Sequence, residues 1–268
     1  ISTTDYKEII KDEDVDLVFI TTRHNLHAEM VIESLNAGKN VFVEKPLALN
    51  EKELERIIIS YQKSGKTLTV GFNRRFSPHI EKIKSIVGNA QMNVIVTINA
   101  GYIPSNAWVH DMKVGGGRII GEACHHIDLI SYLIGSRVEA LCMNAMGTNP
   151  EENTDNANIL LKYENGSTGV VNYFSNGSKA YCKERIEIFS QGRTFIVDNF
   201  RKTKAFGVKG FKKMKTTIDK GHKNLFCRLI KAVQSGGDAL IPFESIVNTT
   251  EATIAVIKSL KENKWINI

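Results

Sequence analysis

Several features that would assign the chain to other classes of protein are missing from its 268 residues. It has only four cysteines, none in a C-x-x-C pair: Cys124, Cys142, Cys182 and Cys227. This scatter fits a reducing compartment better than a disulfide scaffold, so we expect a cytoplasmic protein. No apolar run approaches the roughly 18 residues of a membrane-spanning helix. No zinc-finger, helix-turn-helix or aromatic-rich RNA-binding pattern is present either, so we expect no membrane or nucleic-acid partner.

The positive charge of the chain is local. Residues 201–223 contain eight lysines and one arginine against the single Asp219, which is a net charge of +8. Since the whole chain carries +6, the remaining residues sum to −2. A solvated hairpin or loop explains such a stretch, and a site for a phosphate-bearing ligand or a nucleic acid is the alternative.

The first part of the chain alternates between strand and helix patterns. Apolar strands are predicted at 15–22, 40–44 and 67–72, with a helix at 25–39 and another after residue 50. Asn50 is the predicted N-cap of the second helix, and Glu53 completes a capping box. Strands that alternate with helices pair in parallel through right-handed crossovers, so we predict a doubly wound sheet.

The pattern changes between Gly71 and Pro78. Helices are predicted at 78–88, 124–134, 225–234 and 243–262, and a long strand at 91–103. Two hairpins are predicted to turn at Asn165-Gly166 and near Gln191-Gly192. A run of hairpins is typical of an antiparallel sheet. We therefore place a domain boundary here, with residues 1–75 in one domain and 76–268 in a second α/β domain built on a large, mostly antiparallel open sheet.

The predicted strand at 40–44 ends in a charged turn. Glu44 and Lys45 follow Val43, and Pro46 prevents the hydrogen-bond ladder from continuing. In an open parallel sheet, ligands bind beyond the carboxyl ends of the strands. Lys45 is therefore either an ordinary strand-end lysine or a lysine directed into a site, and the motif alone leaves both interpretations open.

The glycine-rich turn of a dinucleotide-binding sheet is not found. A G-x-G-x-x-G segment after a first strand normally brings backbone amides to the pyrophosphate. The run Gly115-Gly116-Gly117 follows no apolar strand and has a different spacing. We therefore expect the sequence to begin inside a domain, as a fragment or processed form of a longer enzyme that by itself binds cofactor weakly or not at all.

Three segments together resemble the Gfo/Idh/MocA family, the relatives of glucose–fructose oxidoreductase and inositol dehydrogenase. They are "VDLVFITTRHNLHAEMVIESLNAGKNVFVEKPLAL", "GFNRRFSP" and "GGGRIIGEACHHIDLISYLIG". Their details are most similar to a branch fused behind an alcohol-dehydrogenase-like module. The resemblance implies a Rossmann domain, of which residues 1–75 are the C-terminal part, followed by a substrate-binding and oligomerisation domain at 76–268. The last helix of the domain at 76–268 is expected to pack against the first domain.

The resemblance also implies the chemistry. The cofactor is NAD or NADP, the substrate is a sugar, sugar-nucleotide or cyclitol, and the open sheet forms a homo-oligomer. Lys45 orients the substrate hydroxyl and stabilises the developing alkoxide, and the bond before Pro46 is cis. His125 takes the hydroxyl proton, a task that suits an imidazole near neutral pH.

Further site residues follow from the same resemblance. Cofactor contacts are expected from Thr21, Thr22, His27, Glu44, Lys45, Pro46 and Arg74. Substrate contacts are expected from Asn73, Tyr102, Trp108, Arg118 and Asp128. Trp108 is as well explained by packing as by sugar stacking, and Arg118 either reads a substrate anion or pairs on the surface. His24 either caps or solvates its helix, so His27 is the preferred choice of the two.

Two departures from the family pattern bear on function. Many members carry an aspartate four residues before the catalytic histidine, where this chain has Gly121; Glu122, one place later, is the candidate substitute. With the absent phosphate loop, this favours an alternative in which the chain is a non-catalytic binding or scaffold module. Transient oxidation followed by elimination is a third possibility. We expect no metal, because the consecutive side chains of Cys124, His125 and His126 diverge on a helix.

Overall fold

The smaller of two sheets is parallel. The computed structural model, which describes residues 2–268, has a three-stranded sheet with the order β1 (Leu17–Ile20), β2 (Asn40–Val43) and β3 (Leu68–Val70). Both pairs of neighbours run parallel. The crossovers are helices α2 (His27–Asn36) and α3 (Glu51–Ser64), and a short helix, α1 (Tyr6–Lys11), precedes β1. The predicted strand–helix alternation is therefore confirmed.

Local residues set both ends of α3. The side chain of Asn50 accepts a 3.0 Å hydrogen bond from the backbone N–H of Glu53, as predicted for an N-cap. The carboxylate of Glu53 accepts a 2.8 Å bond from the N–H of Leu49 rather than from that of Asn50. The helix ends at Gly65, whose φ of 61° lies in the left-handed region.

The larger sheet has nine strands in the order β11-β10-β9-β8-β4-β7-β6-β5-β12. Its strands are β4 (Asn93–Asn99), β5 (Val138–Ala145), β6 (Asn156–Tyr163), β7 (Thr168–Phe174), β8 (Glu184–Ser190), β9 (Arg193–Asp198), β10 (Lys202–Phe206), β11 (Lys213–Lys215) and β12 (Ile266–Asn267). β4 pairs parallel with β7, and every other pair of neighbours is antiparallel. The mostly antiparallel sheet is thus confirmed.

The turns of this sheet agree with the sequence pattern. Gly166 has a φ of 81° between β6 and β7, and Gln191 and Gly192 have φ values of 50° and 73° between β8 and β9. The basic stretch forms the antiparallel β10–β11 pair, so the predicted hairpin is confirmed. β4 is shorter than the predicted strand at 91–103. It ends at Asn99, and Gly101 bends the chain with a φ of 77°.

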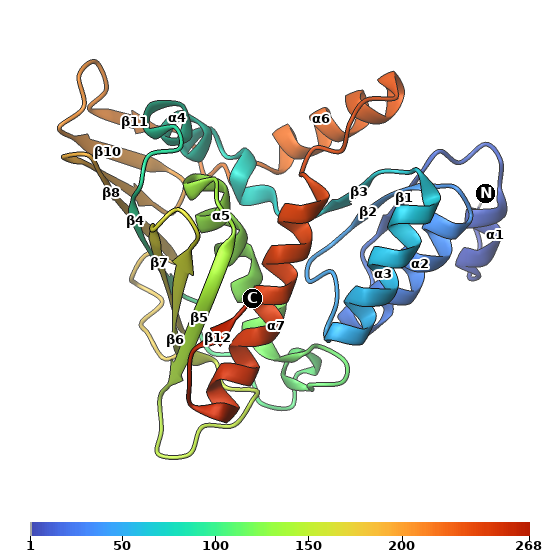
Figure 1. Ribbon diagram of the computed structural model, residues 1–268, viewed down its shortest axis with the longest axis horizontal. Coiled ribbons are helices and arrows are strands. Elements are labelled where there is room, and N and C mark those ends of the chain that lie inside the picture. Colours follow the sequence, from blue (N-terminus) through green and yellow to red (C-terminus); the bar gives the residue numbers. More distant parts are fainter. Residues whose placement is uncertain (1) are drawn as a thin grey trace.

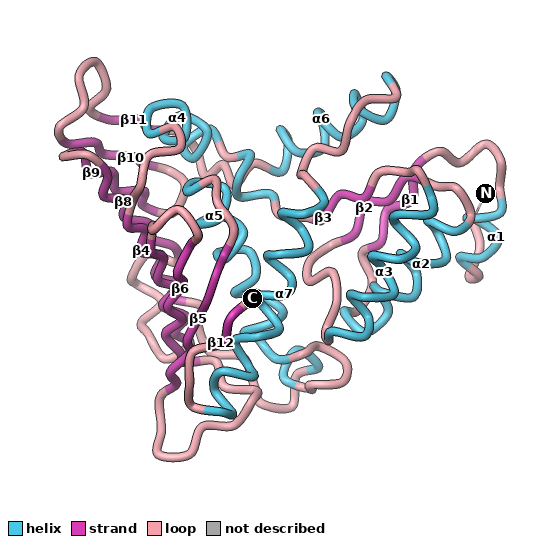
Figure 2. Tube along the Cα trace, in the orientation of Figure 1, coloured by secondary structure: helices cyan, strands magenta, loops and turns pink. Residues whose placement is uncertain are grey.

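Helices cover one face of the larger sheet. Figure 1 shows α5 (Cys124–Ile134) and α7 (Phe243–Glu262) between the two sheets, with α4 (Pro78–Val87) near the β11 end. The opposite face of the sheet is turned away from these helices (Figure 2). Residues along β7 accordingly alternate between buried and more exposed, as expected for a sheet covered on one side.

The apolar residues form two clusters. The larger one joins α4, α5 and α7 to the nine-stranded sheet. The smaller one surrounds the parallel sheet and also includes Leu225 and Leu229 of α6 (His222–Ser235), with Ile246 of α7. Phe42 and Phe226 meet edge to face at 5.3 Å, and Tyr61 stacks on Phe243 at 3.7 Å. The late helices therefore return to pack against the first part of the chain.

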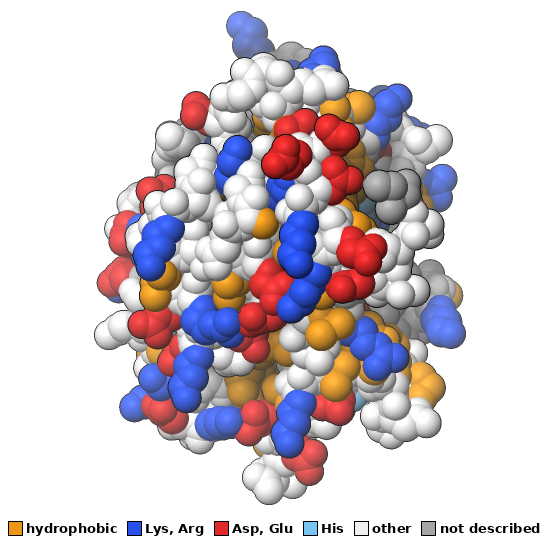
Figure 3. All heavy atoms as spheres, turned by 90° about the vertical axis from the view of Figure 1, so that its right-hand side faces the viewer, with side chains coloured by type: hydrophobic (Ala, Val, Ile, Leu, Met, Phe, Trp, Pro, Cys, Tyr) orange, Lys and Arg blue, Asp and Glu red, His pale blue; other side chains and the backbone are white. Residues whose placement is uncertain are grey.

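The outer face of the first part carries interspersed acidic and basic side chains (Figure 3). Mixed charge of this kind is typical of helices that face solvent. Within residues 2–268, no helix is both long and apolar enough to cross a membrane.

Candidate active site

Lys45 lies where β2 leaves the parallel sheet. The Lys45–Pro46 peptide bond is cis, as the resemblance implied. The Lys45 ammonium donates a 2.8 Å hydrogen bond to the carbonyl oxygen of Gly121. That oxygen lies in a π-helical turn, Ile119–Ala123, which leads directly into α5. Such turns are rare and frequently mark functional sites. The lysine thus connects the strand ends of the first sheet to the helix that carries His125.

His125 is the second residue of α5, a helix that is buried along almost its whole length. Its imidazole is almost fully buried, and Nδ1 has no hydrogen-bond partner among residues 2–268. Burial lowers the pKa of His125 well below its ordinary value, and the positive charges of Arg74 and Lys45 lower it further. The ring is therefore neutral near pH 7 and has a nitrogen lone pair available to accept a proton.

The glycine run at 115–117 allows the loop before it to pack against the residues that follow β1. A Cβ on Gly115 would lie 2.6 Å from the carbonyl oxygen of Trp108, and Gly116 and Gly117 have φ values of 72° and 74°. Only glycine satisfies these positions without strain. The loop then accepts two hydrogen bonds from the first domain: Asn25 N–H donates to the Val114 oxygen at 3.1 Å, and Nδ1 of His24 lies 2.7 Å from the Gly115 oxygen.

His27 is engaged by the protein itself. It is fully buried, with Nδ1 2.8 Å from the carbonyl oxygen of Pro46 and Nε2 3.1 Å from that of Thr22. Burial lowers the pKa of His27, and the two carbonyl oxygens oppose that shift. The ring thus joins the end of β1 to the turn after β2, and its contact with the cofactor stays a prediction.

Glu122 faces away from Gly121 towards the larger sheet. Its carboxylate accepts a 2.6 Å hydrogen bond from the hydroxyl of Tyr173, and the Arg118 guanidinium lies 3.5 Å away. Burial alone would raise the pKa of Glu122, but Tyr173, Arg118 and Lys45 lower it below its ordinary value. The side chain thus stays ionised and does not occupy the place of a carboxylate at position 121.

Two charged residues expected to contact substrate, Asp128 and Arg118, are members of buried ion pairs, and their substrate contacts stay predictions. The Asp128 carboxylate is fully buried and accepts two hydrogen bonds from Arg75, one of them at 3.0 Å. The buried Arg118 side chain donates to the Gly101 oxygen at 2.7 Å and to Asp155 at 3.4 Å. Sequence patterns alone do not separate such partners from ligand contacts, because both use the same residue types.

Asn73 and Arg74 are also held by protein contacts. Arg74 forms a bidentate pair with the buried carboxylate of Glu184, at 2.8 and 3.1 Å. Asn73 donates a 2.7 Å hydrogen bond to the carbonyl oxygen of Lys220, whose ammonium also pairs with Glu184. These contacts join the segment around residues 73–74 to β8, and the ligand contacts expected of Asn73 and Arg74 stay predictions.

The remaining candidates are accessible. Thr21 and Thr22 are exposed at the end of β1, and Glu44 is half-buried at the end of β2. A Cβ on Gly71 would lie 2.9 Å from a carboxylate oxygen of Glu44, so the glycine leaves that carboxylate its space. Trp108 is 37% exposed. A separate cavity of about 460 Å³ is lined mainly by residues that carry a polar group: Tyr102, Ile103, Ser105, His110, Asn153, Thr154, Asp155, Asn156, Ser175 and Asn176.

No metal site is formed by the described residues. Among residues 2–268, no group of three histidine, cysteine, aspartate or glutamate side chains is arranged to hold an ion. All four cysteines are unpaired.

Two family models match the chain. One, described as an oxidoreductase family with an NAD-binding Rossmann fold, matches residues 2–72. The other, the C-terminal domain of the same family, matches residues 88–195. The chain belongs to the Gfo/Idh/MocA family.

Curated relatives of this family member include an uncharacterized oxidoreductase, YrbE, from Bacillus subtilis, 32% identical over 209 residues. That alignment covers 75% of this chain and 60% of YrbE. The myo-inositol 2-dehydrogenase of Thermotoga maritima is 32% identical over 206 residues, which cover 74% of this chain and 61% of the enzyme. The matched part therefore spans about three fifths of these relatives.

Solved structures agree with the fold. A probable dehydrogenase from Thermotoga maritima has a TM-score of 0.79 and 26% identity, with 99% of this chain and 84% of that chain covered. A levoglucosan dehydrogenase in complex with NADH and levoglucosan has a TM-score of 0.83 at 21% identity, covering 99% of this chain and 83% of that one. At this identity the second likeness concerns the fold alone.

Proposed function

We propose that the protein is an NAD(P)-dependent dehydrogenase that oxidises a hydroxyl of a sugar, sugar-nucleotide or cyclitol. One observation carries the proposal: Lys45, at the carboxyl end of a parallel strand, is hydrogen-bonded to the turn that precedes His125. A cation and a neutral imidazole at such a junction are the two groups that hydroxyl oxidation requires from the protein. Family membership and the named activity of the Thermotoga relative support the substrate class.

The residues fit a nicotinamide cofactor. Thr21, Thr22 and Glu44 lie at the carboxyl ends of β1 and β2, where open parallel sheets bind ligands. Gly71 leaves the Glu44 carboxylate unobstructed there. These residues would hold the cofactor, which supplies the hydride acceptor when bound. His27 holds the strand ends that carry them, through its contacts with Pro46 and Thr22.

Lys45 and His125 then have different roles in the reaction. The Lys45 ammonium has three N–H donors, one of which is used by Gly121, so the others can bind the substrate oxygen. That cation stabilises the negative charge which develops on the oxygen during oxidation. The neutral imidazole of His125 takes the hydroxyl proton. Arg118 and Glu122 connect this site to the polar cavity beside Tyr102, which we propose as the place for further hydroxyls of the substrate.

The test uses the full-length natural protein, and every later experiment uses that protein or variants of it. Inositol isomers, hexoses, anhydrosugars and sugar nucleotides are each incubated with NAD⁺ or NADP⁺, and reduced nicotinamide is followed by absorbance. Turnover with at least one of these substrates is expected. Cofactor binding without turnover on any of them would favour a non-catalytic binding module instead.

We also propose a cytoplasmic location, which is in keeping with four unpaired cysteines.

We further propose that the protein forms a homo-oligomer through the uncovered face of the larger sheet. Leu160 on β6 and Phe189 on β8 are 42% and 40% exposed, although both lie on regular strands. Leu160→Glu is expected to lower the solution mass measured by light scattering, while Ile59→Glu on α3 leaves it unchanged. Equal masses for both variants and the wild type would contradict this interface.

A further inference from the structure

The space of a side chain at position 121 is filled by His24. A Cβ built on Gly121 would lie 2.9 Å from Cε1 and 3.3 Å from Nδ1 of His24, and 3.4 Å from the Gly115 oxygen. A separation below 3.0 Å is not tolerated by real side chains, so an aspartate here would displace the His24 ring. The His24 imidazole can therefore lie here only because position 121 carries no side chain.

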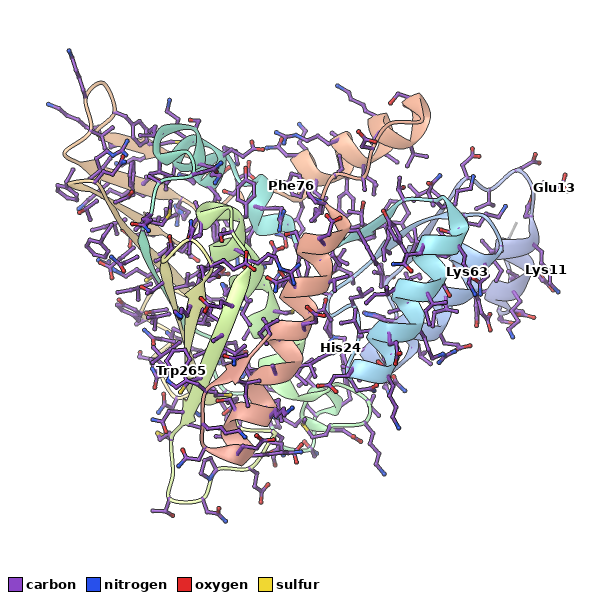
Figure 4. All side chains as sticks on the ribbon, viewed as in Figure 1. Lys11, Glu13, His24, Lys63, Phe76 and Trp265 are labelled. Carbon is purple, nitrogen blue, oxygen red and sulfur yellow. The ribbon has the colours of Figure 1, made fainter. Side chains whose placement is uncertain are left out.

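The His24 ring is fixed in place and in tautomer. Its Nδ1 lies 2.7 Å from the Gly115 carbonyl oxygen, which can only accept, so Nδ1 carries the proton. Trp108 packs edge-on against the ring at 4.9 Å. Nε2 consequently has a lone pair, and it makes no hydrogen bond within the described part of the chain. Figure 4 places His24 in the centre of the molecule, between the two sheets.

Three features place His24 beside Gly121, in the same region as Lys45 and His125. Gly121 and His125 are four residues apart on a helical segment, a spacing that places them on one face. Lys45 is bonded to the oxygen of the same Gly121. His27, Lys45 and Glu122 are the titratable groups that face the ring from the neighbouring elements, and Arg23 lies beyond Trp108.

His24 is neutral at the pH of the cell. Burial lowers the pKa of His24 to about 4, with the Gly115 carbonyl opposing and the Lys45 charge adding to the shift. A neutral ring with a free lone pair is a proton acceptor, which is the property that a carboxylate at position 121 would supply.

We propose that His24 replaces the missing relay aspartate. This rests on the dehydrogenase function proposed above. In oxidation, the substrate O–H bond breaks, its electron pair stays on oxygen and His125 takes the proton. The imidazolium of His125 then passes that proton through intervening water to Nε2 of His24, and along this path each new O–H or N–H bond forms as the preceding one breaks. His24 releases the proton to water, and both rings return to the neutral state. The hydride leaves with the cofactor, so charge and atoms balance.

The decisive variant is His24→Asn. The asparagine amide reproduces the Nδ1–H donor to Gly115 but has no basic nitrogen, so the loop contact stays and the relay is lost. We expect kcat to fall by about 10²-fold, with KM within about threefold of wild type. Added imidazole is expected to restore part of the rate. His79→Gln is the control, because His79, on α4, is buried and its ring contacts the hydroxyls of Thr203 and Thr216.

A pair of substitutions tests whether His24 occupies the space of a side chain at position 121. The melting temperature gives a readout that does not depend on turnover. Gly121→Asp alone is expected to lower the melting temperature, and its combination with His24→Gly is expected to recover stability and part of kcat. An active wild type whose His24→Asn variant keeps full kcat would overturn the relay and leave the dehydrogenase assignment standing. An inactive wild type would overturn the dehydrogenase assignment and, with it, the relay. Gly121→Asp without any loss of stability would overturn the packing on which the relay rests.

Discussion

The ammonium of Lys45 donates a 2.8 Å hydrogen bond to the carbonyl oxygen of Gly121, 76 residues further along the chain. This contact joins the strand that ends at Val43 to the π-helical turn before α5. It places the Lys45 ammonium where its charge acts on the neutral imidazoles of His24 and His125. The site is therefore assembled by contacts between the two parts of the chain, and each part supplies groups that the other lacks.

The buried pair between Arg75 and Asp128 is expected to support the fold. Asp128→Asn removes the carboxylate charge that pairs with the buried Arg75, which is expected to cost about 3–5 kcal/mol in the free energy of unfolding. Urea denaturation measures the difference. Glu139→Gln, which breaks the exposed pair with Lys162, is the control and is expected to cost less than about 1 kcal/mol. Similar losses for both variants would show that burial does not set the cost.

Glu184 is expected to make stability depend on acid pH. Burial alone would raise the pKa of Glu184, but Arg74, His126 and Lys220 hold it well below its ordinary value. A carboxylate with a depressed pKa in the folded state stabilises that state above the unfolded pKa, here about pH 4.5, and the stabilisation is lost as pH falls further.

The free energy of unfolding is therefore expected to decrease between about pH 5 and pH 2, and to decrease less in Glu184→Gln. Denaturation at several pH values in this range checks the slope. A variant as steep as the wild type would assign the pH dependence to other carboxylates.

The contact between Gly71 and Glu44 is expected to affect binding more than folding. Gly71→Ala places a methyl group 2.9 Å from a carboxylate oxygen of Glu44, the mobile end of a half-buried side chain that can move aside. We therefore expect a change in unfolding free energy below about 1 kcal/mol, and a cofactor Kd raised about tenfold. Calorimetric titration with NAD⁺ and NADP⁺ measures the second effect. An unchanged Kd would mean that the Glu44 carboxylate does not face the cofactor.

Local sequence patterns account for most of the fold. α5 and α7 have the predicted bounds, because Gly135 and the turn before Phe243 end and start them locally. The predicted cap of α3 at Asn50 is likewise a contact over three residues. The strand, the two charges and the proline around Lys45 predicted the turn at the strand end, but they left the role of the lysine open, and the family resemblance was needed to propose it for the site.

The less predictable part of the site depends on long-range contacts. His24 meets Gly115 across 91 residues, and Arg75 meets Asp128 across 53. Nothing in the pattern around His24 distinguishes it from a capping residue, and nothing around Asp128 distinguishes a buried ion pair from a substrate contact. The only sequence signal for His24 was indirect, namely the glycine at a position where the family commonly has an aspartate.

The most direct test of the account is a single-turnover measurement on Lys45→Met, which keeps the length of the side chain and removes its charge. With cofactor bound and substrate added, hydride transfer is expected to fall by at least about 10²-fold, with the cofactor Kd within about threefold of wild type. Lys63→Met, on the exposed surface of α3, is expected to behave as wild type. Undiminished hydride transfer in Lys45→Met would contradict the assignment of the active site.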